Sequence, residues 1–252
     1  YRYLYGIWDD MLNTVSRFCM QSSIDADYIF SLGADKNKIF VTGNTKFDQT
    51  YAEVTPEDYA RYKEELGLGE SYPVIMAGST HPGEEKALFD AFKKVRDKYS
   101  DARLVIAPRK TNRADEIAKL AASYGYETGY RSKMLEHPDM RKAYPVVLID
   151  TIGELGRIYA VGDVVYVGGS LSKTGGHNVL EPAAHAKPII VGPNMQNFKD
   201  SYSLLSKVGA CKMINNTTEL ANEMLDIISN DDRRAKMGAA SLQVIKENRG
   251  AD

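Results

Sequence analysis

The stretch that decides the fold runs Val164-Val165-Tyr166-Val167-Gly168-Gly169-Ser170-Leu171-Ser172-Lys173-Thr174-Gly175-Gly176-His177-Asn178-Val179-Leu180-Glu181-Pro182. Its first four residues are typical of a buried strand, and a second apolar run follows at 189–191. A strand, a glycine-rich loop, a helix start and another strand present backbone N–H groups to an anion. We expect His177 and Asn178 at the helix entrance and Glu181 one turn inside. This combination indicates a site for a phosphate and a sugar, although a purely structural loop fits the pattern equally well.

Short β-branched runs and longer amphipathic segments alternate along the rest of the chain. Strands are predicted at 18–21, 39–42, 74–77, 104–107, 126–128, 146–150, 164–167, 189–191 and 211–214. Helices are predicted at 3–16, 24–32, 56–66, 84–98, 113–124, 152–160, 181–186, 202–206, 217–229 and 231–247, with Thr217 as a possible cap. The alternation predicts an α/β fold, a Rossmann-like doubly wound parallel sheet covered on both faces.

The pattern also predicts two parts of unequal size. Residues 51–252 supply a complete doubly wound domain, whereas residues 1–50 supply only two helices and two strands, too little for an independent core. We interpret 1–50 as the last elements and linker of a preceding domain, with the junction in the polar segment 46–53. The chain starts at Tyr1 without a signal peptide and stops at Asp252 without a tail, so we expect both ends to be cut from something longer.

Composition excludes several classes of protein. The apolar fraction of 43% and the charged fraction of 26% are those of a soluble globular protein. The net charge of −2 argues against nucleic acid as a partner. No apolar run is long enough for a membrane span. Cys19 and Cys211 are expected to be free thiols in a reducing cytosol, and no metal site is expected because the acidic residues do not cluster.

Ligands bind open parallel sheets beyond the carboxyl ends of the strands, so four loops are considered together. The loop after 74–77 carries Ser79 and Thr80, whose hydroxyls either hold an oxyanion or cap the next helix. The loop after 104–107 carries Pro108 and Arg109. This arginine is either a clamp for a phosphate or carboxylate or a solvated charge.

The loop after 146–150 contains Gly153, Glu154 and Leu155, whose backbone either faces a base or ribose or caps a helix. The fourth loop is the glycine-rich one. Convergence of all four at one edge favours a joint binding site. The remaining histidines, His81, His137 and His185, are expected to be surface or packing residues, because none has ligand spacing.

Motifs that follow one another along nearly the whole chain resemble a known family. They are Gln21-Ser22, Gly33, Val41-Thr42-Gly43-Asn44-Thr45-Lys46-Phe47-Asp48, Gly78-Ser79-Thr80-His81, Ala107-Pro108-Arg109, Gly153-Glu154-Leu155, Gly168-Gly169-Ser170, Gly175-Gly176-His177-Asn178-Val179-Leu180-Glu181-Pro182, Gly192-Pro193-Asn194-Met195-Gln196-Asn197-Phe198 and Asn248-Arg249-Gly250-Ala251. The chain resembles the 3-deoxy-D-manno-octulosonic acid (Kdo) transferases, which build the inner core of lipopolysaccharide in Gram-negative bacteria. The block from Gly175 to Pro182 is the most specific of these motifs.

The resemblance implies a GT-B glycosyltransferase of two Rossmann-like domains, which displaces CMP from the anomeric carbon of Kdo with inversion. It implies that the C-terminal domain binds the donor CMP-Kdo, and that the N-terminal domain binds a lipid A precursor and supplies the carboxylate base. This chain resembles the C-terminal domain with the last elements of the other. No cofactor and no catalytic residue are therefore expected in it. The resemblance also implies a cytoplasmic protein, with the full-length form on the cytoplasmic face of the inner membrane and touching the membrane only through its N-terminal part.

Donor contacts are implied for residues of all four loops: Ser79, Thr80, Pro108, Arg109, Gly153, Glu154, Leu155, Gly169, Ser170, Gly176, His177, Asn178 and Glu181. Among these, Asn178 and Glu181 are expected at the ribose or phosphate, and Arg109 at the nucleotide or the Kdo carboxylate. The chain departs from the family at Lys173, where other polar or basic residues are frequent. Two other functions remain open, a sugar-nucleotide epimerase of the same architecture and a non-catalytic nucleotide-binding module.

Overall fold

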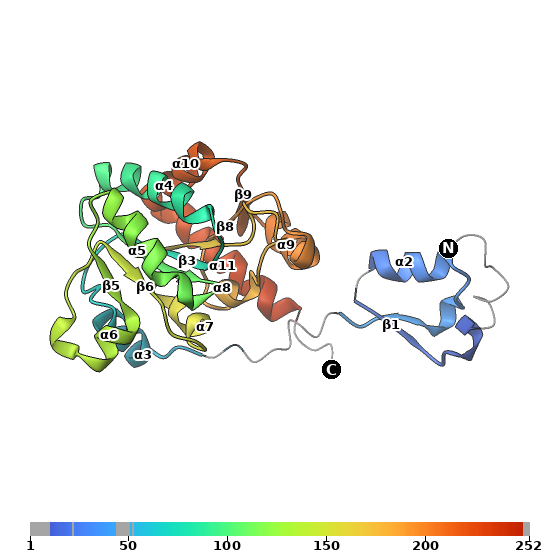
Figure 1. Ribbon diagram of the computed structural model, residues 1–252. Helices are drawn as coiled ribbons and strands as arrows, with labels where there is room; N and C mark the ends of the chain where they lie inside the picture. Colours follow the sequence, from blue (N-terminus) through green and yellow to red (C-terminus); the bar gives the residue numbers. More distant parts are fainter. Residues whose placement is uncertain (1–10, 22, 44–50, 52, 249–252) are drawn as a thin grey trace. The chain divides into compact units, whose positions relative to one another are not determined.

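The computed structural model describes residues 11–21, 23–43, 51 and 53–248 (Figure 1). The chain divides into two compact units, one formed by Tyr1–Thr50 with Ile245–Asp252 and the other by Tyr51–Val244. Parts of several predictions lie outside the described residues. They are most of the helix at 3–16, Ser22 of the motif Gln21-Ser22, residues 44–48 of the motif that begins at Val41, most of the junction at 46–53, and residues 249–251 of the last motif. The assignment of 1–50 and 51–252 to two enzyme domains stays a prediction.

The smaller unit contains a β–α–β element. The helix α2 (Ser23–Ser31) and the 3-10 turn η1 (Lys36–Lys38) connect the parallel strands β1 (Phe18–Met20) and β2 (Ile39–Val41). Among the described residues of this unit five large apolar side chains are exposed, namely Met11, Tyr28, Phe30, Phe40 and Val41. Their exposure agrees with the expectation that so small a unit cannot bury an adequate core by itself.

The larger unit is built on seven parallel strands in the order β5-β6-β4-β3-β7-β8-β9 (Figure 1). The strands are β3 (Val74–Thr80), β4 (Arg103–Pro108), β5 (Thr128–Tyr130), β6 (Val146–Leu148), β7 (Val164–Val167), β8 (Ile189–Val191) and β9 (Cys211–Met213). This order confirms the parallel sheet predicted from the alternation. The sheet extends from β3 in both directions, towards β4 on one side and towards β7 on the other, which makes the β3–β7 boundary a topological switch point.

Helices cover both faces of this sheet (Figure 1). They are α3 (Pro56–Glu65), α4 (Glu84–Lys98), α5 (Ala114–Ser123), α6 (Arg131–Glu136), α7 (Leu155–Ile158), α8 (Leu180–Ala184), α9 (Lys199–Lys207), α10 (Thr217–Ser229) and α11 (Asp231–Glu247), with 3-10 turns η3 (Thr111–Arg113), η4 (Pro138–Met140), η5 (Tyr159–Val161) and η6 (Gln196–Phe198). On one face, Ile75 belongs to the buried core that Phe89 of α4 and Met224 of α10 also share. On the other face, Met76 lies against Gly162, where an added Cβ would be 2.8 Å from the Cβ of the methionine. Alternate residues of β3 thus serve opposite faces, as the pleat requires.

Most predicted elements are confirmed, and the differences have local causes. The strand predicted at 126–128 lies at Thr128–Tyr130, because Tyr126 instead packs on Phe89 and Phe92. The helix predicted at 152–160 starts only at Leu155, since Gly153 has a positive φ of 91°. The cap of α10 is Asn216 and not Thr217: its side chain accepts the N–H of Glu219 at 2.9 Å.

The helix α6 (Arg131–Glu136) was not predicted. Its start is held by a residue from another strand end, because Asp150 accepts both the N–H and the hydroxyl of Ser132, at 2.8 and 2.6 Å. Such a tertiary cap leaves no local signal in the sequence. No helix in the described part of the chain is long and apolar enough to cross a membrane.

Candidate functional site

The loops after β3 and β7 meet at the switch point of the sheet. The N–H of Gly168 donates to the carbonyl of Gly78 at 2.8 Å. A Cβ added to Gly168 would be 2.7 Å from the Cα of Thr80 and would also collide with the carbonyl of Ser79. Glycine at 168 is therefore required by the close approach of two backbones, which brings residues of both loops into one site.

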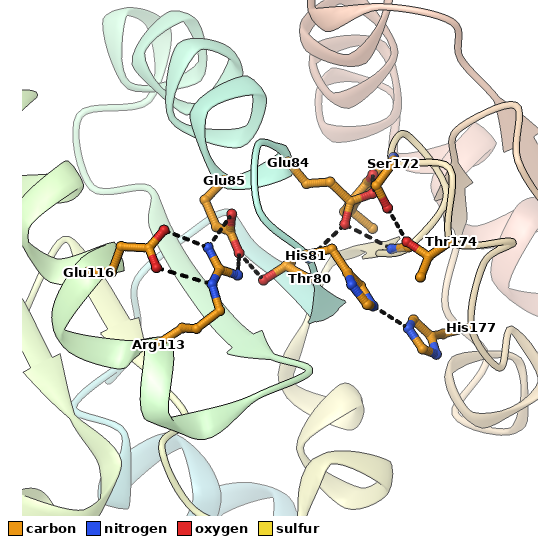
Figure 2. Close-up of polar contacts among 11 residues, drawn as sticks. Thr80, His81, Glu84, Glu85, Arg113, Glu116, Ser172, Thr174 and His177 are labelled. Atoms are coloured by element: carbon orange, nitrogen blue, oxygen red, sulfur yellow. Dashed lines mark hydrogen bonds and ion pairs between the residues drawn. The ribbon is translucent and has the colours of Figure 1, made fainter.

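Glu84, at the start of α4, holds the two loops together (Figure 2). Its side chain is buried, with only 2% of the residue exposed. One carboxylate oxygen accepts the Tyr166 hydroxyl at 2.8 Å and the N–H groups of Ser170, Leu171 and Ser172 at 3.0, 2.9 and 3.3 Å. The other accepts the N–H groups of His81 and Gly169, both at 2.8 Å. The N–H groups from 169 to 172 thus bind a carboxylate of the protein itself, and the presentation of N–H groups by the glycine-rich loop to a ligand anion stays a prediction.

A second buried carboxylate, that of Glu85, accepts a hydrogen bond from the hydroxyl of Thr80 at 2.8 Å. Glu85 also pairs with Arg113 at 2.7 Å, and Arg113 pairs with Glu116 at 2.9 Å (Figure 2). Neither Ser79 nor Thr80 caps α4, since the N-cap residue is Gly83 with a φ of 94°. The alternative prediction of a cap at these hydroxyls is therefore wrong, because the backbone turns once more before the helix begins.

Two histidines contact each other across the switch point (Figure 2). The Nε2 atoms of His81 and His177 are 2.7 Å apart, and their rings lie nearly parallel at 12° with centroids 5.0 Å apart. Burial, together with the positive influence of His81 and Arg109, lowers the pKa of His177, while Glu84 opposes this shift. The expectation of a surface or packing role for His81 did not include this partner, because no spacing in the sequence reveals a contact with a loop so distant in the chain.

Arg109 follows the end of β4 with an exposed side chain. Its N–H donates to the carbonyl of Thr80 at 3.0 Å, which ties it to the loop after β3. Its positive charge lowers the pKa of His177 and opposes the rise that burial causes in the pKa of Glu181. In the described part of the chain the guanidinium has no ion-pair partner. An exposed cation beside two half-buried titratable groups is an arrangement that receives an anion.

Asn178 and Glu181 form the last part of the glycine-rich loop and the first turn of α8. The Asn178 side chain accepts the N–H of Leu180 at 3.0 Å and donates to Glu181 at 3.2 Å. The helix α7, which follows the loop after β6, reaches the same place, since a Cβ added to Gly156 would be 3.8 Å from a carboxylate oxygen of Glu181. Residues of the segments that follow these four strands thus come together at one edge of the sheet.

The carboxylate of Glu154 is committed to protein contacts. It pairs with Arg131 at 3.0 Å and accepts the hydroxyl of Thr151. Arg131 is only 2% exposed and also pairs with Glu65 of α3 at 2.6 Å. Sequence reasoning missed Arg131 because it lies on the unpredicted helix α6. This arginine now explains how Glu154 fixes the loop after β6.

The remaining predicted residues differ in their exposure and in the partners of their polar groups. Gly153 is exposed, Leu155 is half-buried at the start of α7, and Pro108 is buried at the end of β4. The N–H of Gly176 donates to the carbonyl of Gly169 at 2.8 Å, and the Ser170 hydroxyl donates to that of Val167 at 2.6 Å. Thr80, Gly169, Ser170 and Gly176 therefore bind protein partners with their polar groups, and their contacts with a ligand stay predictions.

A pocket of about 860 Å³ lies elsewhere, beside the edge strand β9. Residues of α9, β9 and α11 line it, among them Tyr202, Lys212 and Lys236, and it includes none of the predicted site residues. A smaller one, of about 350 Å³, lies beside Glu84 and Ser172. Among the described residues no group of three His, Cys, Asp or Glu side chains could hold a metal ion.

Comparisons with known proteins show that the chain is similar to glycosyltransferases. The family model described as 3-deoxy-D-manno-octulosonic-acid transferase (kdotransferase) matches residues 1–49. The chain is 31% identical to the 3-deoxy-D-manno-octulosonic acid transferase of Haemophilus influenzae over 244 residues, which are 96% of this chain and 56% of that protein. The chain spans about half the length of the curated relatives it matches.

Among solved structures, the C-terminal CMP-Kdo binding domain of WaaA from Acinetobacter baumannii is 26% identical, with a TM-score of 0.68. The match covers 75% of this chain and 97% of that one. HepE from Anabaena, solved with UDP and glucose, is 13% identical with a TM-score of 0.55, over 98% of this chain and 63% of that one. The predicted fold class is confirmed: the larger unit has the fold of the C-terminal half of a GT-B glycosyltransferase.

Proposed function

Because this chain belongs to the family of 3-deoxy-D-manno-octulosonic acid transferases, we propose that its larger unit binds the activated donor CMP-Kdo. The observation that carries the proposal is the exposed guanidinium of Arg109, which forms no ion pair with any described residue, beside His177 and Glu181 at the switch point. Open parallel sheets bind nucleotides at this place, and an arginine suits a phosphate or a carboxylate, both of which CMP-Kdo carries.

Each residue has a role in this proposal. Arg109 and His177 bind the phosphate of the donor, and Asn178 and Glu181 contact the ribose. Pro108, Gly153 and Leu155 flank the cytidine. Catalysis on the donor side consists of stabilising the negative charge that grows on the departing phosphate. Cationic groups held in fixed positions stabilise such a charge.

The wider activity is also part of the proposal. The whole protein transfers Kdo with inversion from CMP-Kdo to a lipid A precursor in lipopolysaccharide core synthesis. It works on the cytoplasmic face of the inner membrane and reaches both acceptor and membrane through its N-terminal part. The carboxylate base belongs to that part. The residues of this chain therefore act only on the donor side of the reaction.

Calorimetric titration of the purified chain with CMP, UMP and UDP tests the nucleotide specificity. We expect CMP to bind and UMP to bind more weakly, because cytosine and uracil present different donors and acceptors at one ring edge, and mismatched polar groups are costly when buried. Equal binding of all three, or binding of none, contradicts a cytidine site. Preference for UDP favours the sugar-nucleotide epimerase instead.

A further inference from the structure

The contact between His81 and His177 fixes how many protons the two rings can hold. A separation of 2.7 Å between two Nε2 atoms is a hydrogen bond, so one ring donates and the other accepts. Two imidazolium rings would both donate and would repel each other. In this geometry the pair therefore carries one positive charge at most.

The two rings are held on independent loops by one carboxylate. The N–H of His81 donates to Glu84, and so does the N–H of Gly169, at 2.8 Å each. The His177 ring rests on Gly169, where a Cβ would be 2.8 Å from the ring Cδ2. The imidazoles thus face each other because Glu84 holds their two loops together, and the ring contact is separate from these backbone contacts.

We propose that His81 and His177 form a proton-sharing pair, which carries one excess proton in the free protein and takes up a second one when the phosphate of a nucleoside monophosphate binds beside Arg109. This inference rests on the proposed function, because it assigns a phosphate to that site. The second proton comes from solvent. The hydrogen bond between the rings breaks, and each imidazolium donates its Nε2–H to a phosphate oxygen.

The charges around the pair support this coupling. Arg109, at the end of β4, disfavours a second positive charge in the free protein, and so does the burial of His177. Glu84 of α4 favours it, but its oxygens already accept six donors. Glu181 of α8 interacts with Arg109. A phosphate carrying nearly two negative charges reverses the balance, and binding and protonation then favour each other reciprocally.

Calorimetry between pH 6 and 8, in buffers of different ionisation enthalpy, counts the protons taken up per CMP bound. We expect the wild-type chain to take up more protons than His81→Asn or His177→Asn, and its affinity for CMP to rise by up to about tenfold more per unit fall in pH. CMP binds a proton itself, equally for every variant, so the difference between chains isolates the pair. His137→Asn, an exposed histidine, serves as the matched control and should behave as the wild type.

The ligand-free protein offers a second readout, which does not depend on how well the variants fold. The chain has four histidines, so their ring signals can be followed individually by NMR. We expect the ring nitrogen signals to show one hydrogen bond shared between His81 and His177 in the free protein, lost when CMP binds, and His137 to be unaffected by CMP. Absence of that hydrogen bond in the free protein, or equal proton uptake by wild type and variants, overturns the inference alone. Absence of CMP binding to the wild type overturns the proposed function and this inference with it.

Discussion

Arg109 is the side chain on which the phosphate proposal depends most directly. Its backbone is tied to Thr80, while its guanidinium is exposed and stands close enough to His177 and Glu181 to change both pKa values. We expect Arg109→Ala to weaken CMP binding by about 1.5–3 kcal/mol, the usual contribution of a hydrogen bond to a charged group. Calorimetric titration with CMP measures this loss.

Lys110→Ala provides the matched control for that measurement. Lys110 is also exposed, is the next residue in the chain and carries the same charge. Thermal unfolding should be nearly unchanged in both variants, because neither side chain is in the core. Equal CMP affinity of Arg109→Ala and the wild type would return Arg109 to the interpretation of a solvated charge.

At the scale of elements, the glycine-rich loop after β7 depends on α4 for its shape, through the carboxylate of Glu84. Replacing Glu84 by Gln keeps one acceptor oxygen and puts an NH₂ group where the N–H groups of His81 and Gly169 now donate. We expect Glu84→Gln to lower the free energy of unfolding by about 1–3 kcal/mol for each buried donor left without a partner.

Urea unfolding of the Glu84→Gln chain measures this change. Glu136→Gln is the control, since Glu136 is exposed on α6 and its substitution should leave the urea midpoint unaltered. A Glu84→Gln midpoint equal to that of the wild type would mean that the loop holds its conformation without the carboxylate.

The order of elements in the larger unit could be predicted because hydrophobic period and strand length are local properties. The strands at 164–167 and 189–191 and the helices at 84–98, 217–229 and 231–247 have the predicted bounds. Elements capped from a distance could not be predicted. The helix α6 begins where Asp150 from another strand end accepts the N–H of Ser132.

The candidate site was predictable to the level of loops but not of partners. Topology alone places Arg109, His177 and Glu181 at one edge, because the carboxyl ends of parallel strands coincide. The contacts of His81 with His177 and of Arg131 with Glu154 join residues far apart in the chain, and no spacing rule encodes them. The role of Glu84 could not be predicted either, because in the sequence it is an ordinary acidic residue in the first turn of a helix.

At the scale of the whole molecule, the question is whether these 252 residues can complete a transfer. The resemblance assigns the base that deprotonates the acceptor hydroxyl to the N-terminal domain, and donor-side binding energy cannot replace proton removal. We therefore expect the chain to bind CMP yet to show no turnover with CMP-Kdo and a lipid A precursor. A radiometric transfer assay checks this, with the Haemophilus influenzae transferase as the positive control.

Robust transfer by the chain alone would contradict this expectation and show that it contains its own base. Glu181 and His177 would then be the first residues to substitute. Addition of the N-terminal domain of a relative in trans, with restored turnover, would separate a donor-binding half from a non-catalytic nucleotide module.

The junction between β3 and β7 also determines at what stage of folding the candidate site forms. His81 and His177 are 96 positions apart, and Glu84 reaches 88 positions along the chain to Ser172. Closing so long a stretch costs chain entropy before any contact is gained, so this junction belongs to the late, non-local part of folding. A nascent chain that has not yet emerged past Pro182 lacks the proposed nucleotide site, however well its first strands and helices have formed. Under the proposed function, nucleotide affinity is therefore acquired in one step with the completed centre of the sheet, and a bound nucleotide would stabilise the finished molecule over every partly folded one.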